Sequence, residues 1–304
     1  MAEKLNGHKR IPDGVWVFLS SVFFALGGLL FKIISWDALA ISSARSILAG
    51  TVILVFLLIR RHHFVLNRHV ILAALSISAT NTLYAIANKL TTAGNTIVLQ
   101  FTMPVFVILI MAVCYRKRPG RMECIVCLLV LAGILCFFID SLSAGNMTGN
   151  LLALASGVCY AGFFIFNSRE DSEPFTAILL SYGLTAMIGL PSLLKTEIAA
   201  SPAGEIAAVL ALGIVQQAVA QLCFATGIRG TGAVAAGLIS GLEPILNPVL
   251  VALFAGESLT PLSMVGAVTV VATVVIYDLL NSRKQSADEK QNGTAADTEA
   301  APGH

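Results

Sequence analysis

Residues 94–115 read GNTIVLQFTMPVFVILIMAVCY, an apolar stretch that contains no charged side chain. A transmembrane helix needs about 20 consecutive, mostly apolar residues to cross the hydrocarbon core of a bilayer. This stretch has that length, and comparable runs recur along the chain. Of the 304 residues, 57% are hydrophobic and only 12% are charged, which leaves too little polar surface for a water-soluble globule. The sequence therefore predicts an all-α integral membrane protein.

Short polar or Gly/Pro-containing segments separate about ten apolar runs, which predicts ten transmembrane helices. The runs lie near residues 14–34, 39–59, 70–88, 94–115, 122–140, 150–168, 175–194, 205–226, 231–255 and 261–280. Small residues dominate the eighth and ninth runs, which favours close contact between helices over contact with lipid. The first run is too long for the core of a signal peptide, so we interpret it as a retained helix.

The distribution of Lys and Arg predicts the orientation, because cytoplasmic segments near helix ends keep an excess of positive charge. With the N-terminus inside, 15 of the 19 Lys and Arg residues fall in cytoplasmic segments. Lys32, Lys89 and Lys195 lie at outer helix ends, and Arg45 lies within a run. We therefore expect a multi-pass protein of the plasma membrane, of the bacterial inner-membrane type, with both termini in the cytoplasm.

The two halves of the chain differ in the charge of their loops. The segments 60–68 and 116–121 in the first half are basic, whereas their counterparts in the second half are not. A repeated unit of five helices must insert its second copy upside down, and such inverted repeats are common in secondary transporters. An offset of 140 residues pairs Tyr84–Pro104 with Phe224–Pro244, and further upstream the offset becomes about 136. The pattern predicts two inverted five-helix repeats.

One part of the second half resembles a known family. Gly241-Leu242-Glu243-Pro244, followed by FAGESLT at 254–260, resembles the Leu-Glu-Pro element and the Gly-Glu turn of EamA-like transporters in the drug/metabolite transporter superfamily. The first half departs from that pattern, with Thr102-Met103-Pro104 and Cys114-Tyr115-Arg116-Lys117 in those places. The resemblance implies a helical bundle around a central cavity, alternating access, and carriage of amino acids, other metabolites or drugs across the plasma membrane.

The resemblance covers nearly the whole chain except its tails, and it implies four segments. We expect a cytoplasmic N-terminal tail at 1–11, a first five-helix repeat at 12–140, a second at 149–281, and a cytoplasmic tail at 282–304. The C-terminal tail is polar and too poor in apolar residues to pack, so we expect it to be disordered.

Polar side chains within the predicted spans are the candidates for a binding site, because each unsatisfied polar group in hydrocarbon costs several kcal/mol. Asn81 and Tyr84 share one face of the third span, and Gln217 and Gln221 share one face of the eighth. The repeat places Gln221 opposite Asn81, which predicts a substrate site near the membrane midplane. Hydrogen bonding between helices, worth about 0.6 kcal/mol on average in membranes, explains the amides equally well.

Two further features extend this predicted substrate site. Pro104 removes a backbone donor and so frees the carbonyl of Gln100, next to an amide that we expect to face the substrate. Aromatic residues at positions matched by the repeat, among them Tyr160 and Phe224, are candidates for cavity walls, although packing is the commoner use of an aromatic at helical spacing.

Glu243 lies near the middle of its run, where inserting an acidic side chain costs on the order of 2.5–3.5 kcal/mol. It shares a helix face with Asn247 and lies beside two prolines that free backbone carbonyls. One interpretation makes Glu243 a proton-coupling carboxylate, and the other, which we favour, makes it a cap or ion-pair partner of a kinked helix. For Arg45 we likewise favour a structural role, reaching toward the outer interface or pairing with Glu243, over binding a substrate carboxylate.

The sequence lacks the motifs of other functional classes. Cys124 and Cys127 have neither the second cysteine pair nor the histidines that a zinc site needs. His62, His63 and His69 have no carboxylate near them in sequence, so we expect them to be solvated. No Gly-x-x-x-x-Gly-Lys-Ser/Thr motif is present, so the sequence does not encode an ATP-binding site that could drive transport. We expect no enzymatic activity, no cofactor and no metal.

Together these features predict a secondary active transporter of small organic solutes, such as amino acids or related metabolites, that works by alternating access around a midplane cavity. A proton-coupled multidrug exporter, for which Glu243 would be essential, is the alternative. As partners we expect a small-molecule substrate and the lipid bilayer, and no nucleic acid. Coupling to a proton or a sodium gradient, and the choice between monomer and homodimer, stay open.

Overall fold

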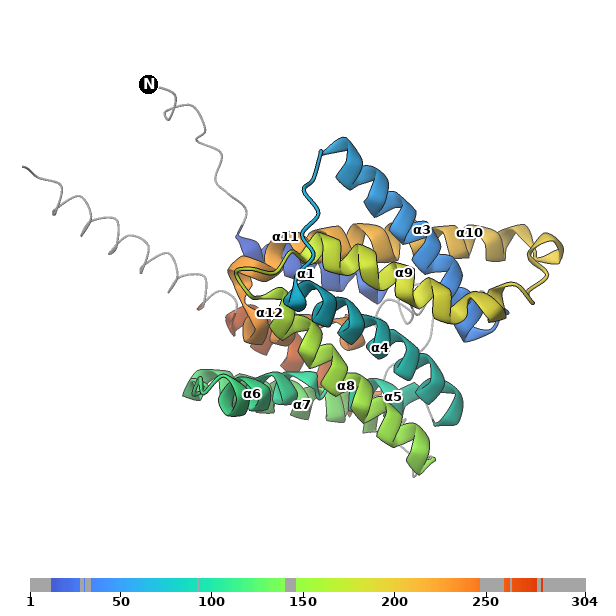
Figure 1. Ribbon diagram of the computed structural model, residues 1–304. Coiled ribbons are helices and arrows are strands. Elements are labelled where there is room, and N and C mark those ends of the chain that lie inside the picture. The colour runs from blue at the N-terminus through green and yellow to red at the C-terminus, as the bar shows by residue number, and fades with distance from the viewer. Residues whose placement is uncertain are drawn as a thin grey trace, which may run out of the picture.

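A computed structural model describes residues 12–27, 30, 34–91, 93–139, 146–246, 260–262, 264–277 and 280. Every regular element in these residues is a helix (Figure 1). Six segments are long and apolar enough to cross a membrane, namely Ala38–Ile59, Arg68–Ala87, Asn95–Cys114, Met147–Asn167, Pro174–Leu193 and Ala203–Thr231. Shorter apolar helices cover Asp13–Ala25, Ala235–Leu246 and Met264–Tyr277. The all-helical, multi-span architecture is therefore confirmed, and the count of ten spans stays a prediction.

The helices follow the order that the apolar runs predicted. The first half contains α1 (Asp13–Ala25), α3 (Ala38–Ile59), α4 (Arg68–Leu90), α5 (Ala93–Gln100), α6 (Met103–Cys114) and α7 (Arg121–Phe138). The second half contains α8 (Met147–Asn167), α9 (Pro174–Leu193), the short 3₁₀ helix η2 (Ile198–Ala200), α10 (Ala203–Ala211), the π-helix η3 (Leu212–Val219), α11 (Ala220–Thr231) and α12 (Ala233–Ser240). The segments α10, η3 and α11 follow one another without a break and form one long span.

One span in each half is interrupted at the same point of the repeat. The helix breaks at residues 101–102 between α5 and α6, and it breaks again at residues 241–242 after α12. These positions are 140 residues apart, and each break comes just before a proline, Pro104 or Pro244. Proline donates no backbone hydrogen bond and clashes with the preceding turn, so it belongs at the start of a helix. The two halves thus share helix boundaries as well as residues.

The two halves interlock. α4 packs along α8, and the span that contains η3 and α11 packs along α1. The third span of each half thus packs against the first span of the other half. α3 packs against α9, α4 also contacts α9, and η3 also contacts α3. Figure 1 shows α1 and α11 close together in one part of the bundle and α4 crossing α8 in another. Exchanging the halves maps these contacts onto each other.

Glycines allow the closest of these helix contacts. A Cβ atom placed on Gly227 of α11 would lie 2.4 Å from the carbonyl oxygen of Asp13 on α1. A Cβ on Gly213 of η3 would lie 2.5 Å from Cβ of Leu48 on α3. Close backbone approach through small residues is the usual way in which helices associate in lipid, as the small-residue composition of this span predicted.

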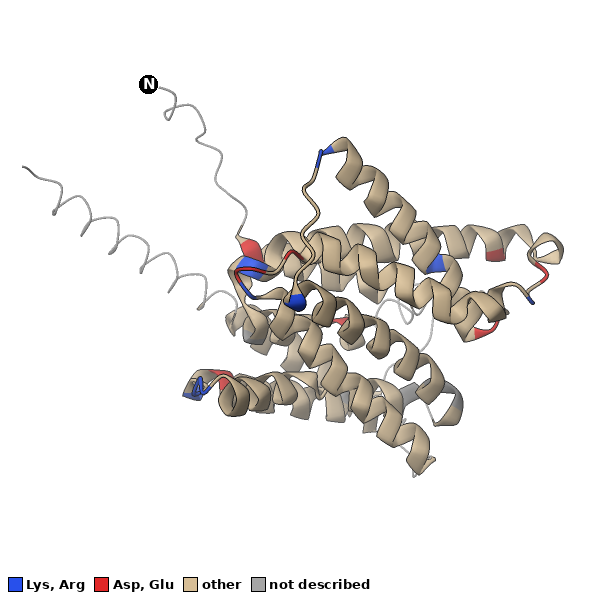
Figure 2. Ribbon diagram, viewed as in Figure 1, with Lys and Arg blue, Asp and Glu red and all other residues tan. Residues whose placement is uncertain are grey.

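Charged side chains lie mostly at helix ends and in connections, and one lies inside α3, where the sequence has Arg45 (Figure 2). One end of the bundle carries the basic loop between α6 and α7 (Figure 2). Arg169 lies over the ring of Tyr115 just before that loop, and Arg229 contacts Ser172 in the connection from α8 to α9. At the opposite end, the described residues around the start of α3 and the connection from α9 to α10 are mostly acidic. This asymmetry agrees with a cytoplasmic basic end, which stays a prediction.

Candidate functional site

Two opposite charges lie near each other within the bundle. Arg45 is on α3, and Glu243 begins the helix that resumes after the break at 241–242. The Glu243 carboxylate lies close enough to the Arg45 guanidinium for the two charges to interact. Protein surrounds both side chains, and each keeps part of its surface accessible. A buried charge is tolerated when an opposite charge lies close by. The structural role expected for Arg45, as a partner of Glu243, stays a prediction.

Three tyrosines lie close enough to interact electrostatically with one or the other member of this pair. Tyr84 of α4 and Tyr182 of α9 interact electrostatically with the Arg45 guanidinium, and Tyr160 of α8 interacts with the Glu243 carboxylate. The Tyr182 side chain is 2% exposed, and its hydroxyl donates to the backbone carbonyl of Gln217 at 3.4 Å. Sequence analysis had singled out Tyr84 and Tyr160 but missed Tyr182, because nothing in the sequence of α9 distinguishes it from a packing aromatic.

The amides predicted to face each other do not meet directly. Gln217 and Gln221 are each 5% exposed, whereas Asn81 on α4 is half-buried. No hydrogen bond joins Asn81 to Gln221 in the described part of the chain. Gln217 is tied to the neighbourhood of Arg45 through its backbone carbonyl, which accepts from Tyr182. Of these amide residues, Gln217 is the one that the printed contacts link to the neighbourhood of Arg45.

Gln217 belongs to the π-helix η3, which sequence analysis had expected to be a regular α-helix. Short π segments within α-helices are frequent at functional sites. Gln216, which was overlooked, is also 5% exposed and donates from Nε2 to the carbonyl oxygen of Phe24 on α1 at 3.3 Å. No composition signal distinguishes a π turn from an α turn here, so the sequence could not have revealed it.

Gln100 ends α5 and is 9% exposed. Its backbone carbonyl, which the following break leaves outside the helix, packs against α8, because a Cβ on Gly157 would lie only 2.9 Å from that oxygen. This contact brings the broken span against the helix that carries Tyr160. Asn247, the remaining candidate, lies outside the described residues.

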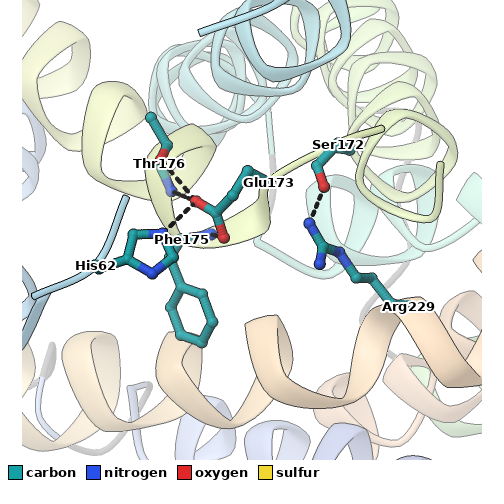
Figure 3. A network of polar contacts seen from close by, with 6 residues as sticks. All are labelled: His62, Ser172, Glu173, Phe175, Thr176 and Arg229. Atoms are coloured by element: carbon teal, nitrogen blue, oxygen red, sulfur yellow. Dashed lines mark hydrogen bonds and ion pairs between the residues drawn. The ribbon is translucent and has the colours of Figure 1, made fainter. Parts of the chain in front are cut away.

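A second polar cluster lies at the basic end of the bundle, where the connection from α8 to α9 meets the loop after α3 (Figure 3). Glu173 caps α9 and accepts hydrogen bonds from the amides of Phe175 at 3.3 Å and Thr176 at 2.6 Å, and from the Thr176 hydroxyl at 2.6 Å. Its Oε2 also lies 3.0 Å from Nε2 of His62. Burial alone would raise the pKa of Glu173, but the hydrogen bonds from Thr176 and the contact with His62 outweigh burial and lower it.

The same connection is held at two further points. His69, in the first turn of α4, places Nδ1 2.7 Å from Oδ2 of Asp171, and this hydrogen bond lowers the pKa of Asp171. Arg229 of α11 donates to the carbonyl of Ser172, as Figure 3 shows. The expectation that His62 and His69 lack carboxylate neighbours is therefore wrong. The carboxylate that meets His69 comes from a position 102 residues further along the chain, which local sequence cannot show.

The acidic end has a corresponding junction between the start of α3 and the segment after α9. Asp37 caps α3 by accepting from the amide of Leu39 at 3.0 Å, and it also accepts from the Ser192 hydroxyl at 2.8 Å. Trp36 donates from Nε1 to the Ser201 hydroxyl at 2.9 Å. A shallow hollow of about 310 Å³ lies over this junction. Among the described residues, no three His, Cys, Asp or Glu side chains gather as a metal site requires.

Comparison with known proteins agrees with this architecture. The EamA-like transporter family matches the chain twice, over residues 14–139 and 147–277. The uncharacterized transporter YwfM of Bacillus subtilis (strain 168) is 25% identical over 285 residues, which cover 90% of this chain and 96% of YwfM. A protein of known crystal structure superposes with a TM-score of 0.78 at 16% identity, over 88% of this chain and 98% of the other, which supports the fold alone. The chain therefore belongs to the EamA-like transporter family, and it is a membrane transporter, as the Leu-Glu-Pro element had indicated.

Proposed function

We propose that this protein carries small polar organic solutes, amino acids or related metabolites, across the plasma membrane by alternating access around Arg45 and Glu243. The observation that supports this proposal is the gathering of an arginine, a glutamate and three tyrosines from different spans inside an apolar bundle. Ionisable residues within membrane spans mark substrate or ion pathways as a rule. In this proposal the segments 12–140 and 149–281 are inverted repeats, and the site lies between them.

The chemistry of the pair fits a zwitterionic solute. The planar guanidinium of Arg45 offers a carboxylate two parallel hydrogen bonds. In the empty site, Glu243 balances the charge of Arg45. When a zwitterion binds, its carboxylate pairs with Arg45 and its ammonium pairs with Glu243, so that no charge is left uncompensated. A lipophilic cation brings no anion for Arg45, which favours the metabolite carrier over the multidrug exporter.

The test is uptake into proteoliposomes containing the purified protein, with a panel of radiolabelled amino acids and an imposed proton or sodium gradient. We expect saturable uptake by the wild-type protein and a loss of roughly tenfold or more in Arg45→Gln, because a hydrogen bond to a charged group contributes about 1.5–3 kcal/mol. Arg121→Gln, at the exposed start of α7, removes a positive charge far from the site and is the matched control.

The alternative function has its own readout in the same vesicles. Absence of saturable amino acid uptake under either gradient, together with efflux of a lipophilic cation that Glu243→Gln abolishes, would overturn the proposal in favour of proton-coupled drug export. Size-exclusion profiles of each variant establish that a lost activity reflects the site and not a failure to fold.

A further inference from the structure

The helix α6 ends on an arginine in a strained backbone conformation. Arg116 follows the C-cap residue Tyr115 and has a φ of 53°, in the left-handed region that is costly for every residue with a Cβ atom. The amide of Lys117 then donates to the carbonyl of Met111 at 3.0 Å and closes the helix end. Glycine is the common residue at this position of a helix end. Because the arginine is kept at a cost in stability, its side chain is a candidate for a function.

The second half of the chain has glycine at the equivalent position. The repeat offset of 140 residues pairs Arg116 with Gly256 and Lys117 with Glu257. Arg118 follows, so the first half has three consecutive cations where the second half has Gly-Glu-Ser. Glycine is thus compatible with this position of the repeat, and the basic residues point to a role other than forming the turn.

The three cations of this loop are available to a partner outside the chain. Arg116, Lys117 and Arg118 are all exposed, and no carboxylate in the part of the chain that the structure describes pairs with them. The nearby Glu123 carboxylate instead accepts from the amide of Gly120 at 2.9 Å. Figure 2 shows the Lys and Arg residues of this loop gathered at one end of α6 and α7.

A fourth cation reaches the same place from the other half of the chain. Arg169 lies just beyond the end of α8, and its guanidinium is 4.4 Å from the centre of the Tyr115 ring. At this distance the cation is attracted to the face of the ring. The contact holds Arg169 next to the residue from which the basic loop begins, so cations from both halves meet at one point of the surface.

Apolar side chains lie just below the basic loop. Leu109 and Val113, one turn apart on α6, are 50% and 76% exposed. They belong to the span Asn95–Cys114, which is long and apolar enough to cross a membrane, so in a bilayer they face acyl chains. A molecule bound here meets cations at one end and apolar side chains along its length. A phospholipid with an anionic headgroup has this form.

We propose that Arg116, Lys117, Arg118 and Arg169 bind the phosphate of an anionic phospholipid whose acyl chains lie along the exposed face of α6. Arginine offers a phosphate two parallel hydrogen bonds, which makes it the preferred residue for such a group. Clusters of basic residues beside a membrane span are attracted to anionic lipids. The site lies at the membrane surface, and the inference does not depend on which solute the protein carries.

The test compares Arg116→Gly with Arg61→Gly. Arg61 is the matched control, because it also follows the C-cap of a span, α3, at the basic end and has a φ of 50°. Phosphatidylglycerol or phosphatidylcholine is titrated into detergent micelles of the full-length protein while its unfolding temperature is measured. We expect phosphatidylglycerol, but not phosphatidylcholine, to raise the unfolding temperature of the wild type. Arg116→Gly should need roughly fivefold more phosphatidylglycerol for the half-maximal shift, and Arg61→Gly should need no more than the wild type.

Both glycine variants relieve a left-handed backbone, so without lipid both should unfold at a slightly higher temperature than the wild type. A weaker lipid response of Arg116→Gly then reflects the lost guanidinium and not a damaged fold. An unchanged half-maximal concentration in Arg116→Gly would overturn the site. An equal increase in Arg61→Gly would also overturn it, because the response would then follow net charge. Equal stabilisation by inorganic phosphate, which lacks acyl chains, would contradict a lipid as the ligand.

Discussion

The two ends of the bundle join equivalent helices with different side chains. The offset of 136 residues pairs Asp37 with Glu173, and both carboxylates cap a helix, α3 at the acidic end and α9 at the basic end. Each also reaches across to the other half of the chain. Asp37 meets the hydroxyl of Ser192 at 2.8 Å, whereas Glu173 meets the imidazole of His62 at 3.0 Å.

The partners of the two carboxylates differ in chemistry. Ser192 offers a neutral hydroxyl, whereas His62 offers an imidazole ring. The basic end has a second histidine–carboxylate pair, His69 with Asp171. It also has a hydrogen bond from the Arg229 guanidinium to the backbone carbonyl of Ser172. At the acidic end Trp36 donates to Ser201, and Ser35 donates to the Glu205 carboxylate from both its amide and its hydroxyl. The basic junction is therefore held by imidazole and guanidinium groups, whereas the acidic junction is held by hydroxyl, amide and indole donors.

The largest expected effect on thermal stability comes from removing the two capping carboxylates one at a time. A lost N-cap costs about 0.5–2 kcal/mol at either position. Asp37→Ala also loses the Ser192 hydroxyl, whereas Glu173→Ala loses both the Thr176 hydroxyl and the His62 contact. We therefore expect Glu173→Ala to lower the unfolding temperature more than Asp37→Ala does. Glu173→Gln keeps an acceptor oxygen and should recover part of the loss. Equal effects of Glu173→Ala and Asp37→Ala in differential scanning fluorimetry would show that the histidine adds nothing.

The boundaries of these helices could be predicted from the sequence, because apolar length and proline position are local signals. The run 39–59 became α3 (Ala38–Ile59), and the run 175–194 became α9 (Pro174–Leu193). Pro104 and Pro244 located the two breaks. Similar residues at an offset of 136 to 140, together with the matching order of the spans, were enough to infer that the chain is built from two related halves.

The contacts between distant segments could not be predicted in the same way. Which carboxylate meets His69 depends on how α4 packs along α8, and a single sequence contains no distance between them. The π turn at Gln216 was hidden because it depends on how the chain fits between α1 and α3, not on residue type. The sequence did identify Arg45 and Glu243, because a charge in an apolar run is conspicuous wherever the helix packs.

Thiol labelling at the two ends is expected to give the next largest difference. In a variant without native cysteines, Ser172→Cys and Ile34→Cys place a buried thiol at the basic and the acidic junction, where the native side chains are 1% and 7% exposed. His62 and His69 hold the basic junction through Glu173 and Asp171, so we expect the junction to open more often when both histidines are replaced. At one fixed pH, where the reactivity of the thiol is the same in each comparison, maleimide labelling of Ser172→Cys should accelerate several-fold in the His62→Gln/His69→Gln background, and that of Ile34→Cys should not change.

Glutamine keeps a polar group at both positions but carries no positive charge, so the double variant removes the charge-assisted part of these contacts. His63→Gln, an exposed neighbour, is the control and should leave the labelling rate of Ser172→Cys unchanged. Equal labelling rates in the wild-type and double-variant backgrounds would show that the two histidines do not hold the junction.

The smallest expected effect is that of Asp171→Asn. The Asp171 side chain is 59% exposed, so solvent screens its interaction with His69. Because that hydrogen bond lowers the pKa of Asp171, the stabilisation is fully present above the ordinary carboxylate pKa and is lost as the pH falls through the lowered value. Wild-type protein should therefore lose slightly more thermal stability than Asp171→Asn when the pH is taken below about 4. Glu170→Gln, the adjacent carboxylate, should behave like the wild type. If Asp171→Asn instead loses as much thermal stability as the wild type below about pH 4, the His62–Glu173 pair alone distinguishes the basic junction from the acidic one.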